Sequence, residues 1–403
     1  MPNLIIGAVP RGADYFGREG FIESLWSKLE HDNLLLVAPR RFGKTGAMYR
    51  LLDEPRGPFR PIYLNVEHLG SANNFMVELL AALLRDRHFT RIVAGLWEET
   101  KDFARFLRDL PQEVQVGALK MAIRERTDVA AEWFAYGERL VGLLARDEPR
   151  PLLLIDELPI LVANIARRDA EEARRFLRWF RVARTAPGTR TRFVVGGSVS
   201  LVASLDELGL VDTISDLMPV ALEAFDRATA ESYVRAVFED RGLPLRRDIA
   251  ETVLEIVGEP IPFLLAVLLS ATFDRLRKPG ETLTPELVRA TFEEDVLGGG
   301  TSAVFQHYRS RIDQYYSGRE GPAALSLLGL LSRAEAPVER TTLYHSYLQG
   351  GNRRPSTGSE ESFRRLMNRL ENDFYVVRQD GGYAFHSRVL QLWWSTHYGY
   401  QYE

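Results

Sequence analysis

The chain has 403 residues, enough for two or three domains with separate cores, and a formal net charge of -4 that gives no general attraction to nucleic acid. Hydrophobic residues make up 45% of the chain and charged residues 26%, as in ordinary globular proteins, and the absence of cysteine excludes disulfides and thiolate metal sites. The N-terminus lacks the regions of a signal peptide and no apolar run approaches the roughly 20 residues that span a bilayer, so we expect a cytoplasmic protein without a membrane partner.

The first predicted element is an amphipathic helix that follows the tetrapeptide Phe16-Gly17-Arg18-Glu19. One face of this helix is apolar, and it carries Phe21, Ile22, Leu25 and Leu29.

The next segment, residues 34–46, has the sequence LLLVAPRRFGKTG. Its first four residues are continuously apolar, as expected for a parallel strand covered on both faces. The following eight match the P-loop pattern G-x-x-x-x-G-K-[ST], except that Ala38 replaces the first glycine. This departure is mild, because the position needs a small residue more than it needs a positive φ. The alternative is a strand–turn–helix whose arginines lie in solvent.

The P-loop chemistry assigns a role to each part of this segment. Gly43 allows backbone N–H groups to approach phosphate oxygens, Lys44 reaches the β- and γ-phosphates, and the Thr45 hydroxyl ligates Mg²⁺. The residues that we expect to hold ATP are Ala38, Pro39, Arg40, Arg41, Phe42, Gly43, Lys44, Thr45 and Gly46.

A strand predicted at residues 62–66 is followed by a long helical stretch at about 73–144, and then by a second buried strand at residues 152–155. Asp156 and Glu157 come directly after that strand, and ligands of open α/β sheets bind beyond the carboxyl ends of the strands. We therefore expect Asp156 to hold Mg²⁺ and Glu157 to polarise the attacking water. An isolated Asp-Glu pair is often only a charged turn, but its place downstream of a P-loop favours an ATPase.

A helix follows in which Arg174, Arg178 and Arg181 share one face, opposite an apolar face formed by Ala173, Phe176, Leu177 and Phe180. Our candidate for an arginine finger, which would reach the γ-phosphate of a neighbouring subunit, is Arg178. The alternative is a solvated cationic face.

The last predicted strand of this region, residues 193–195, ends in Gly196-Gly197-Ser198. Ser198 is a candidate polar sensor that orients the attacking water, with a helix cap or turn residue as the alternative. Alternating strands and helices predict an α/β fold, a P-loop NTPase parallel sheet with helices on both faces.

From residue 217 to about 297 the pattern predicts only helices, and the three glycines within residues 297–305 suggest a linker. Three helices at residues 322–333, 341–349 and 359–372 are then followed by a hairpin signal at Asp380-Gly381-Gly382. This order predicts a winged helix. The expected domains are therefore a P-loop core over 1–217, an all-helical lid over 218–297 and a winged-helix domain over 298–403.

Within this last domain, Arg364, Arg365 and Arg369 lie on the helix that would be the recognition helix of a winged fold. They could contact the phosphates or guanine edges of duplex DNA, although acidic residues flank them. The alternative is a solvated helix in a domain that contacts protein. The histidines lack metal-ligand spacing, and Trp393 and Trp394 are most simply explained as core.

Taken together, these motifs resemble the STAND and archaeal-type ATPases of the AAA+ superclass, which are related to origin-recognition initiators. The likeness lies in the box at residues 16–19, the loop APRRFGKT, the strand LLLIDEL and the pair Gly197-Ser198. It implies that ATP binds between the α/β core and the lid, that Phe16, Gly17 and Arg18 help to close the adenine pocket, and that the nucleotide state controls assembly.

Two positions depart from the family pattern. Phe21 stands where the box usually carries another acidic residue, and the arginine or histidine expected near residues 258–260 has no counterpart. These departures imply hydrolysis that is slow or assisted by a neighbouring subunit.

The leading hypothesis is a Mg²⁺- and ATP-dependent switch, in regulation or defence, that forms homo-oligomers or binds a protein partner. The alternative hypothesis is an ATP-dependent DNA-binding protein, similar to an initiator or a transposition regulator, that uses the winged helix to bind duplex DNA.

Overall fold

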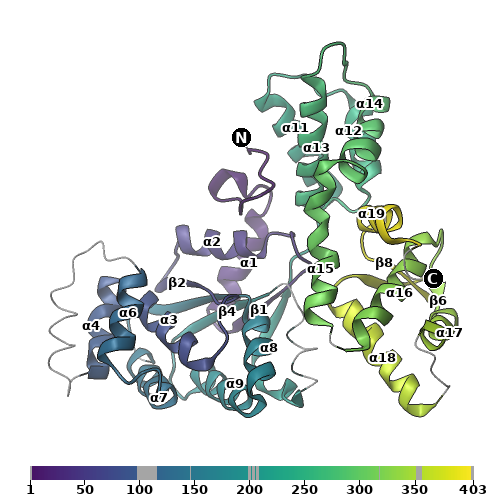
Figure 1. The fold of residues 1–403 in the computed structure, drawn as a ribbon. Coiled ribbons are helices and arrows are strands. Elements are labelled where there is room, and N and C mark those ends of the chain that lie inside the picture. Colours follow the sequence, from purple (N-terminus) through teal and green to yellow (C-terminus); the bar gives the residue numbers. More distant parts are fainter. Residues whose placement is uncertain are drawn as a thin grey trace. The chain divides into compact units, whose positions relative to one another are not determined.

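A computed structural model describes residues 2–97, 116–145, 147–197, 201, 205, 208–316, 318–350 and 356–400 (Figure 1). The chain divides into two compact units. The sheet unit comprises residues 18–37 and 44–222, and the C-terminal unit comprises residues 1–17, 38–43 and 223–403. The P-loop segment therefore changes unit between positions 43 and 44. The expected division into three domains stays a prediction.

The sheet unit is built on five parallel strands in the order β2-β3-β4-β1-β5. The strands are β1 (Asn33–Val37), β2 (Phe59–Asn65), β3 (Arg150–Asp156), β4 (Arg192–Gly196) and β5 (Leu217–Ala221). Leu34, Leu35 and Leu36 of β1 and the apolar run of β3 are buried, as central strands of a parallel sheet require, whereas Val37 at the end of β1 is exposed. Because β4 lies between β1 and β3, the end of β4 borders both the P-loop strand and the acidic strand.

Helices cover both faces of this sheet, with α1 and α2 on one face and α8 and α9 on the other (Figure 1). The helices of the unit are α1 (Glu19–Leu29), α2 (Lys44–Asp53), α3 (Ala72–Leu84), α4 (Arg87–Ala94), α6 (Val116–Arg126), α7 (Trp133–Leu144), α8 (Leu158–Arg168) and α9 (Ala170–Thr185), with the short turns η2 (Gly95–Trp97) and η3 (Val211–Ile214). The predicted α/β architecture is confirmed.

The described helices of the helical stretch predicted at 73–144, which is an insertion between β2 and β3, belong to the core of the sheet unit. Phe75 on α3 packs edge-on against Phe176 on α9, with ring centroids 5.1 Å apart. Phe180, one turn further along α9, packs in the same manner on Phe193 of β4 at 5.6 Å. Aromatic contacts thus run from the insertion through α9 to the sheet, and these side chains bury large apolar surfaces.

The prediction of an entirely helical stretch from residue 217 is wrong at its start, because β5 forms the edge of the sheet beside β1. This strand contains Pro219, which has no N–H to donate, and proline is tolerated where a strand has one neighbour. The proline and the short length of the strand hid it from the sequence pattern.

The C-terminal unit is helical apart from a small three-stranded sheet in the order β6-β8-β7. Its helices are η1 (Gly12–Asp14), α11 (Arg227–Asp240), α12 (Arg247–Val257), α13 (Pro262–Leu276), α14 (Pro285–Thr291), η4 (Phe292–Leu297), η5 (Gly300–Phe305), α15 (Gln306–Tyr315), α16 (Glu320–Arg333), α17 (Arg340–Gly350), α18 (Thr357–Asn372) and α19 (Arg388–Tyr398). Its strands are β6 (Val338–Glu339), β7 (Val376–Gln379) and β8 (Gly382–Phe385).

The glycine-rich segment suggested as a linker does not continue an α-helix, in agreement with its composition. The chain instead passes through the π-helical turn η4 and the 3-10 turn η5, and Phe305 at the end of η5 is buried. The segment is therefore a helical connection with a buried anchor.

The predicted hairpin joins β7 to β8 through Asp380 and Gly381, both with positive φ (49° and 80°), as its tight turn requires. Trp393 and Trp394 on α19 are fully buried, as predicted. Among the described residues, no helix combines the length and the apolar character needed to cross a membrane.

Candidate functional site

The backbone of the loop at residues 38–43, between β1 and α2, has an unusual shape. Arg41 and Gly43 both have positive φ, at 71° and 104°. A side chain at position 43 would in addition place its Cβ 3.0 Å from Cε2 of Tyr15. Successive backbone N–H groups in such turns form anion-binding concavities, so the glycine requirement agrees with the predicted phosphate-binding role. The left-handed conformation of Arg41 was not predicted, because nothing in an arginine indicates it.

Directly after this loop, the first turn of α2 contacts the end of β3 within the sheet unit. The Thr45 hydroxyl donates a hydrogen bond to Oδ2 of Asp156 over 2.6 Å. Lys44 and Gly46 on either side of Thr45 are buried. Two sequence motifs 111 residues apart therefore meet at one carboxylate oxygen.

The same Asp156 oxygen accepts a hydrogen bond from a second hydroxyl group, a contact that was not predicted from the sequence. The hydroxyl of Tyr63 on β2 donates a hydrogen bond to Oδ2 over 3.1 Å. Strands β2 and β3 pair in parallel register, with Tyr63 opposite Leu154, two residues before Asp156. Tyrosine is common in strands for packing reasons alone, so its residue type carried no signal of this contact.

Asp156 is only 2% exposed, and its environment opposes its charge. Burial raises the pKa of Asp156, and the neighbouring Glu157 raises it further, whereas the hydroxyls of Thr45 and Tyr63 and the charge of Lys44 lower it. A carboxylate in this position favours a bound cation.

The residues present fit Mg²⁺ together with a nucleotide rather than a metal held by protein alone. Thr45 and Asp156 offer two neighbouring oxygen ligands, and in the part of the chain that the structure describes no group of three His, Cys, Asp or Glu residues forms a metal site. Mg²⁺ is usually held by one or two protein oxygens plus phosphates and water.

Glu157 follows Asp156 in a left-handed conformation, with φ of 64°, and precedes α8. Such conformations cost about 1–3 kcal/mol for residues other than glycine and occur often at functional sites. The left-handed residue Glu157 makes the turn between the end of β3, which is Asp156, and the start of α8 at Leu158.

The two glycines at the end of β4 leave space beside both carboxylates. A Cβ on Gly196 would lie 3.6 Å from Oδ1 of Asp156, and one on Gly197 would lie 3.6 Å from Oε2 of Glu157. Each would also collide with a neighbouring side chain, since Cε of Met48 and Cδ of Pro159 are 2.7 Å and 2.5 Å away. Ser198, the predicted sensor, lies outside the described residues.

Residues 16 and 17 pack against helix α11 in the C-terminal unit. Gly17 has a φ of 66°, and a Cβ there would lie 2.5 Å from Cγ2 of Thr229 on α11. The rings of Phe16 and Tyr233, also on α11, lie 5.6 Å apart. Arg18, which belongs to the sheet unit, is buried at the start of α1. The expected role of this box in closing an adenine pocket stays a prediction.

The arginines of α9 have different partners. Arg178 is exposed, whereas Arg181 forms an ion pair with Asp212 at 3.0 Å and Arg174 lies 3.6 Å from Glu171. The predicted apolar face, with Ala173, Phe176, Leu177 and Phe180, is buried.

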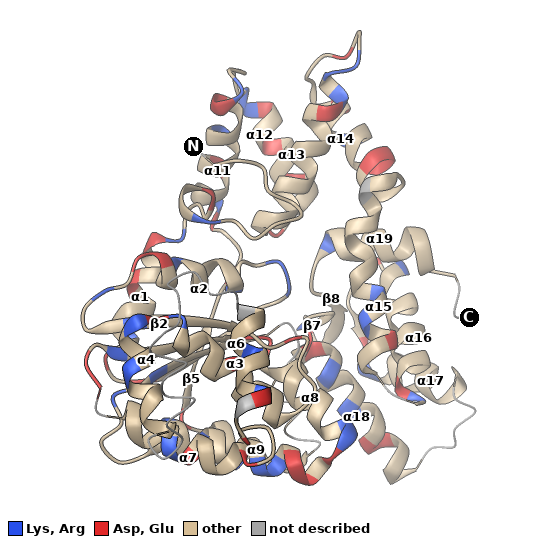
Figure 2. Ribbon diagram, turned by 60° about the vertical axis from the view of Figure 1, so that its left-hand side comes forward, with Lys and Arg blue, Asp and Glu red and all other residues tan. Residues whose placement is uncertain are grey.

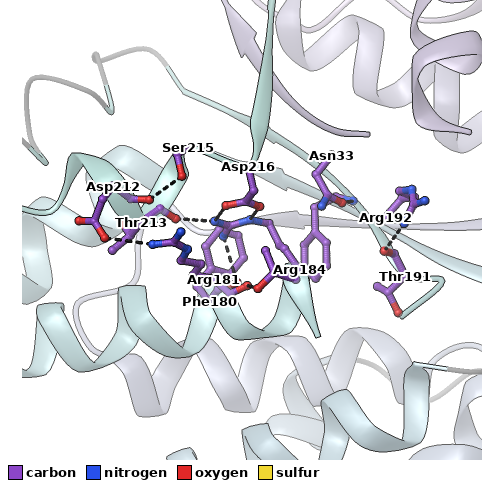
Figure 3. Close-up of polar contacts among 12 residues, drawn as sticks. Asn33, Phe180, Arg181, Arg184, Thr191, Arg192, Asp212, Thr213, Ser215 and Asp216 are labelled. Atoms are coloured by element: carbon purple, nitrogen blue, oxygen red, sulfur yellow. Dashed lines mark hydrogen bonds and ion pairs between the residues drawn. The ribbon is translucent and has the colours of Figure 1, made fainter. Parts of the chain in front are cut away.

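Another arginine of α9, Arg184, which was not singled out from the sequence, lies on this buried face. Arg184 forms a two-pronged ion pair with Asp216, at 2.7 and 2.8 Å, and donates to the carbonyl oxygens of Thr213 and Phe180 (Figure 3). The sequence did contain one indication of this buried role, because Arg184 lies at helical spacing on the same face of α9 as Phe176 and Phe180.

The predicted nucleic-acid residues on α18 differ in exposure. Arg364 and Arg365 are exposed, and α18 carries acidic as well as basic residues (Figure 2). Arg369 instead forms an ion pair with Glu320 at 3.0 Å and donates to the carbonyl oxygen of Tyr315 at 2.7 Å. Arg369 therefore already holds α18 against neighbouring helices of its own unit.

Comparisons with known proteins identify the fold. Neither the protein-family models nor the curated proteins contain a match to the chain. Among solved structures, a Walker-type ATPase of Pyrococcus abyssi is similar, with a TM-score of 0.61, 17% identity and coverage of 97% of this chain and 99% of that one. The ORC2 protein of Aeropyrum pernix, in ADPNP and ADP complexes, has a TM-score of 0.53 at 14% identity, with coverage of 98% and 96%.

At these identities the likeness concerns the fold. The chain has the fold of these P-loop ATPases, a parallel sheet with helices on both faces followed by helical and C-terminal regions. The narrower resemblance to STAND proteins stays a prediction.

Proposed function

We propose that the chain is an ATP-binding and ATP-hydrolysing switch whose nucleotide state controls self-assembly or the binding of a protein partner. The observation that carries this proposal is the contact between Thr45 and Asp156 at 2.6 Å, because it joins the P-loop motif to the acidic strand end. The likeness in fold to a Walker-type ATPase and to a protein described in ADPNP and ADP complexes supports it.

The residues of the chain divide the chemistry of hydrolysis between them. Lys44 and the backbone of residues 38–43 would bind phosphate oxygens, and Thr45 and Asp156 would hold Mg²⁺. When bound, Mg²⁺ supplies positive charge that offsets the charge of the phosphates. Glu157 would orient a water molecule and accept its proton, assisted by Ser198, while Arg178 would act on the site of a neighbouring subunit.

This division of roles predicts different defects for two variants. Lys44→Ala should lower the affinity for ATP by 100-fold or more. Glu157→Gln should keep its affinity for ATP, lose most of its turnover and accumulate the nucleotide-dependent assembled form. Equilibrium binding of a fluorescent ATP analogue, phosphate release and native mass measurements with ATP and Mg²⁺ test these expectations.

The matched control for Lys44→Ala is Lys278→Ala, which removes an exposed lysine of the C-terminal unit and should change neither binding nor turnover. Full turnover by Glu157→Gln would remove Glu157 from the mechanism. Absence of nucleotide binding by the unmodified chain would end the proposal as a whole.

A second candidate function, binding of duplex DNA, draws support from the exposure of Arg364 and Arg365 on α18. It requires the winged-helix interpretation of the C-terminal region, in which α18 would be the recognition helix.

A further inference from the structure

Cations gather around the first turns of α15 in the C-terminal unit. Arg40 and Arg41 of the loop and Arg311 of α15 all act electrostatically on two neighbouring residues of that helix, His307 and Tyr308. Positive charges repel one another, and this repulsion is relieved when an anion binds among them. Two of the three arginines belong to the predicted phosphate-binding loop.

Packing contacts connect the loop to the same turn of α15. The ring of Phe42 meets the ring of His386 edge-on, with centroids 6.3 Å apart. The backbone N–H of His386 donates to the carbonyl oxygen of Tyr375 at 3.0 Å, and the Tyr375 hydroxyl donates to the carbonyl oxygen of Tyr308 at 2.8 Å. The loop that carries Arg40 and Arg41 is therefore connected to the first turn of α15 by a continuous series of side-chain and backbone contacts.

His307 has a polar atom that this environment leaves unsatisfied. Its Nδ1 lies 2.7 Å from the carbonyl oxygen of Val304, which can only accept, so Nδ1 carries a proton. Its Nε2 is buried and has no hydrogen-bond partner among the described residues. A buried polar atom without a partner is unfavourable, so a ligand that gives it a hydrogen bond gains affinity.

The ring is neutral as long as no anion is near. Burial lowers the pKa of His307 to about 3, and the charges of Arg40, Arg41 and Arg311 contribute, while the hydrogen bond to Val304 acts in the opposite direction. Negative charge brought close to the ring would raise this pKa, because it stabilises the protonated form.

We infer that His307 senses the phosphates of the nucleotide: when they occupy the loop at residues 38–43, the ring takes up a solvent proton at Nε2 and, while keeping that proton, donates a hydrogen bond from the new N–H to a phosphate oxygen. This inference rests on the proposed function, because it requires that a nucleotide binds to the loop. Protonated at both nitrogens, His307 then tethers α15 to the ligand, and the hydroxyl of Tyr375 extends the contact to the hairpin.

Calorimetric titration of the chain with the Mg²⁺ complex of a non-hydrolysable β,γ-methylene ATP analogue tests the inference. Titrations in buffers of different ionisation enthalpy report the number of protons taken up on binding. We expect net proton uptake on binding that grows as the pH falls from 7 toward 5, and a dissociation constant that rises with pH by at most tenfold for each unit.

His307→Gln should abolish this uptake, and His345→Gln, which alters an exposed histidine on α17, should leave it unchanged. Nitrogen-15 spectra of the histidine rings in the unmodified chain provide a measurement that does not depend on a variant: one ring should change from neutral to protonated when the analogue binds.

The outcomes separate this inference from the proposed function. Binding of the analogue without proton uptake, or uptake that persists in His307→Gln, would overturn the role of His307 and leave the proposed function standing. No binding of the analogue by the unmodified chain would overturn both.

Discussion

Asp156 occupies a position in which its charge is unfavourable until a cation arrives. It is almost completely buried and lies next to Glu157, and these two factors raise its pKa despite two hydroxyl donors and Lys44. A raised pKa means that the folded chain holds the proton more tightly than the unfolded chain does. Ionisation of Asp156 therefore costs stability as the pH rises above 3.8, the ordinary value.

Replacement of the charge should consequently stabilise the ligand-free protein. At pH 7, without nucleotide or Mg²⁺, Asp156→Asn should unfold at a higher urea concentration than the unmodified chain, and the difference should shrink as the pH falls toward 4. Each unit by which the pKa is raised corresponds to about 1.4 kcal/mol. The same variant should lose the effect of Mg²⁺ on nucleotide affinity.

Glu67→Gln is the control, because it removes an exposed acidic residue of the same unit and should change stability by no more than about 0.5 kcal/mol. An Asp156→Asn protein that is less stable than the unmodified chain at pH 7 would contradict this view of Asp156.

At this scale, the sequence predicted contacts that belong to a motif and missed those that do not. Thr45 and Asp156 could be paired in advance because their motifs place them after two strands of one sheet. The contribution of Tyr63 depends on the register of β2 against β3, which short apolar strands do not reveal. The positive φ of Arg41 is likewise a property of the folded loop.

Helix α9 has one face exposed to solvent and an opposite, buried face that contains an ion pair. Its exposed face carries Arg178, and its buried face carries Arg184, which is bound to Asp216 just before β5 (Figure 3). The guanidinium of Arg184 also lies 4.3 Å above the ring of Phe180. This arrangement fixes the edge strand β5, whose sequence alone does not predict a strand.

Loss of one partner of this buried pair should destabilise the sheet unit. Arg184→Met should lower the free energy of unfolding by about 3–5 kcal/mol, because it leaves the Asp216 carboxylate without its partner in a shielded position. The double variant Arg184→Met/Asp216→Leu should recover most of the loss. Urea unfolding followed by circular dichroism measures both.

Arg178→Met, a change of the same chemistry on the exposed face of α9, should stay within about 0.5 kcal/mol of the unmodified chain. An equal loss in the two single variants would show that the ion pair has no special weight.

Among the helices and strands, those with a clear hydrophobic pattern were predicted correctly. The edge strand β5 and the exact start of α18 were not. The strands β1 and β3 are continuous apolar runs, which identify buried parallel strands. Helix α18 was predicted to open at Ser359, but Ser356 caps it, with Ser359 completing a capping box. A second serine three residues away made the boundary ambiguous.

For the whole molecule, the sequence indicated the order of the regions but not their grouping. The loop at 38–43 lies in sequence between two elements of the sheet unit, yet it belongs to the C-terminal unit with residues 1–17. Its anchors are Arg41, which lies 4.6 Å from the ring of Phe263 and donates to the carbonyl oxygen of Ile6, and Phe42, which meets His386. Contacts between residues so distant in sequence leave no local pattern.

The two candidate functions, a nucleotide-dependent switch and a DNA-binding protein, concern the whole molecule. Substitution of the exposed residues Arg364 and Arg365 distinguishes them. Under the proposed function, the double variant Arg364→Gln/Arg365→Gln should keep its ATP turnover and its nucleotide-dependent change in mass, because neither residue belongs to the site around Asp156. Turnover assays and native mass measurements check this expectation.

If duplex DNA is the partner, the same variant should bind it more weakly at every sequence, and the slope of log affinity against log salt should fall by about 2, one phosphate contact for each arginine. Arg247→Gln/Arg277→Gln removes the same charge from exposed positions of the C-terminal unit, and it separates a local contact on α18 from a general effect of net charge. If both double variants lose DNA affinity equally, α18 is not the DNA-binding helix. If only Arg364→Gln/Arg365→Gln loses the ATP-dependent change in mass, α18 is part of the assembly interface.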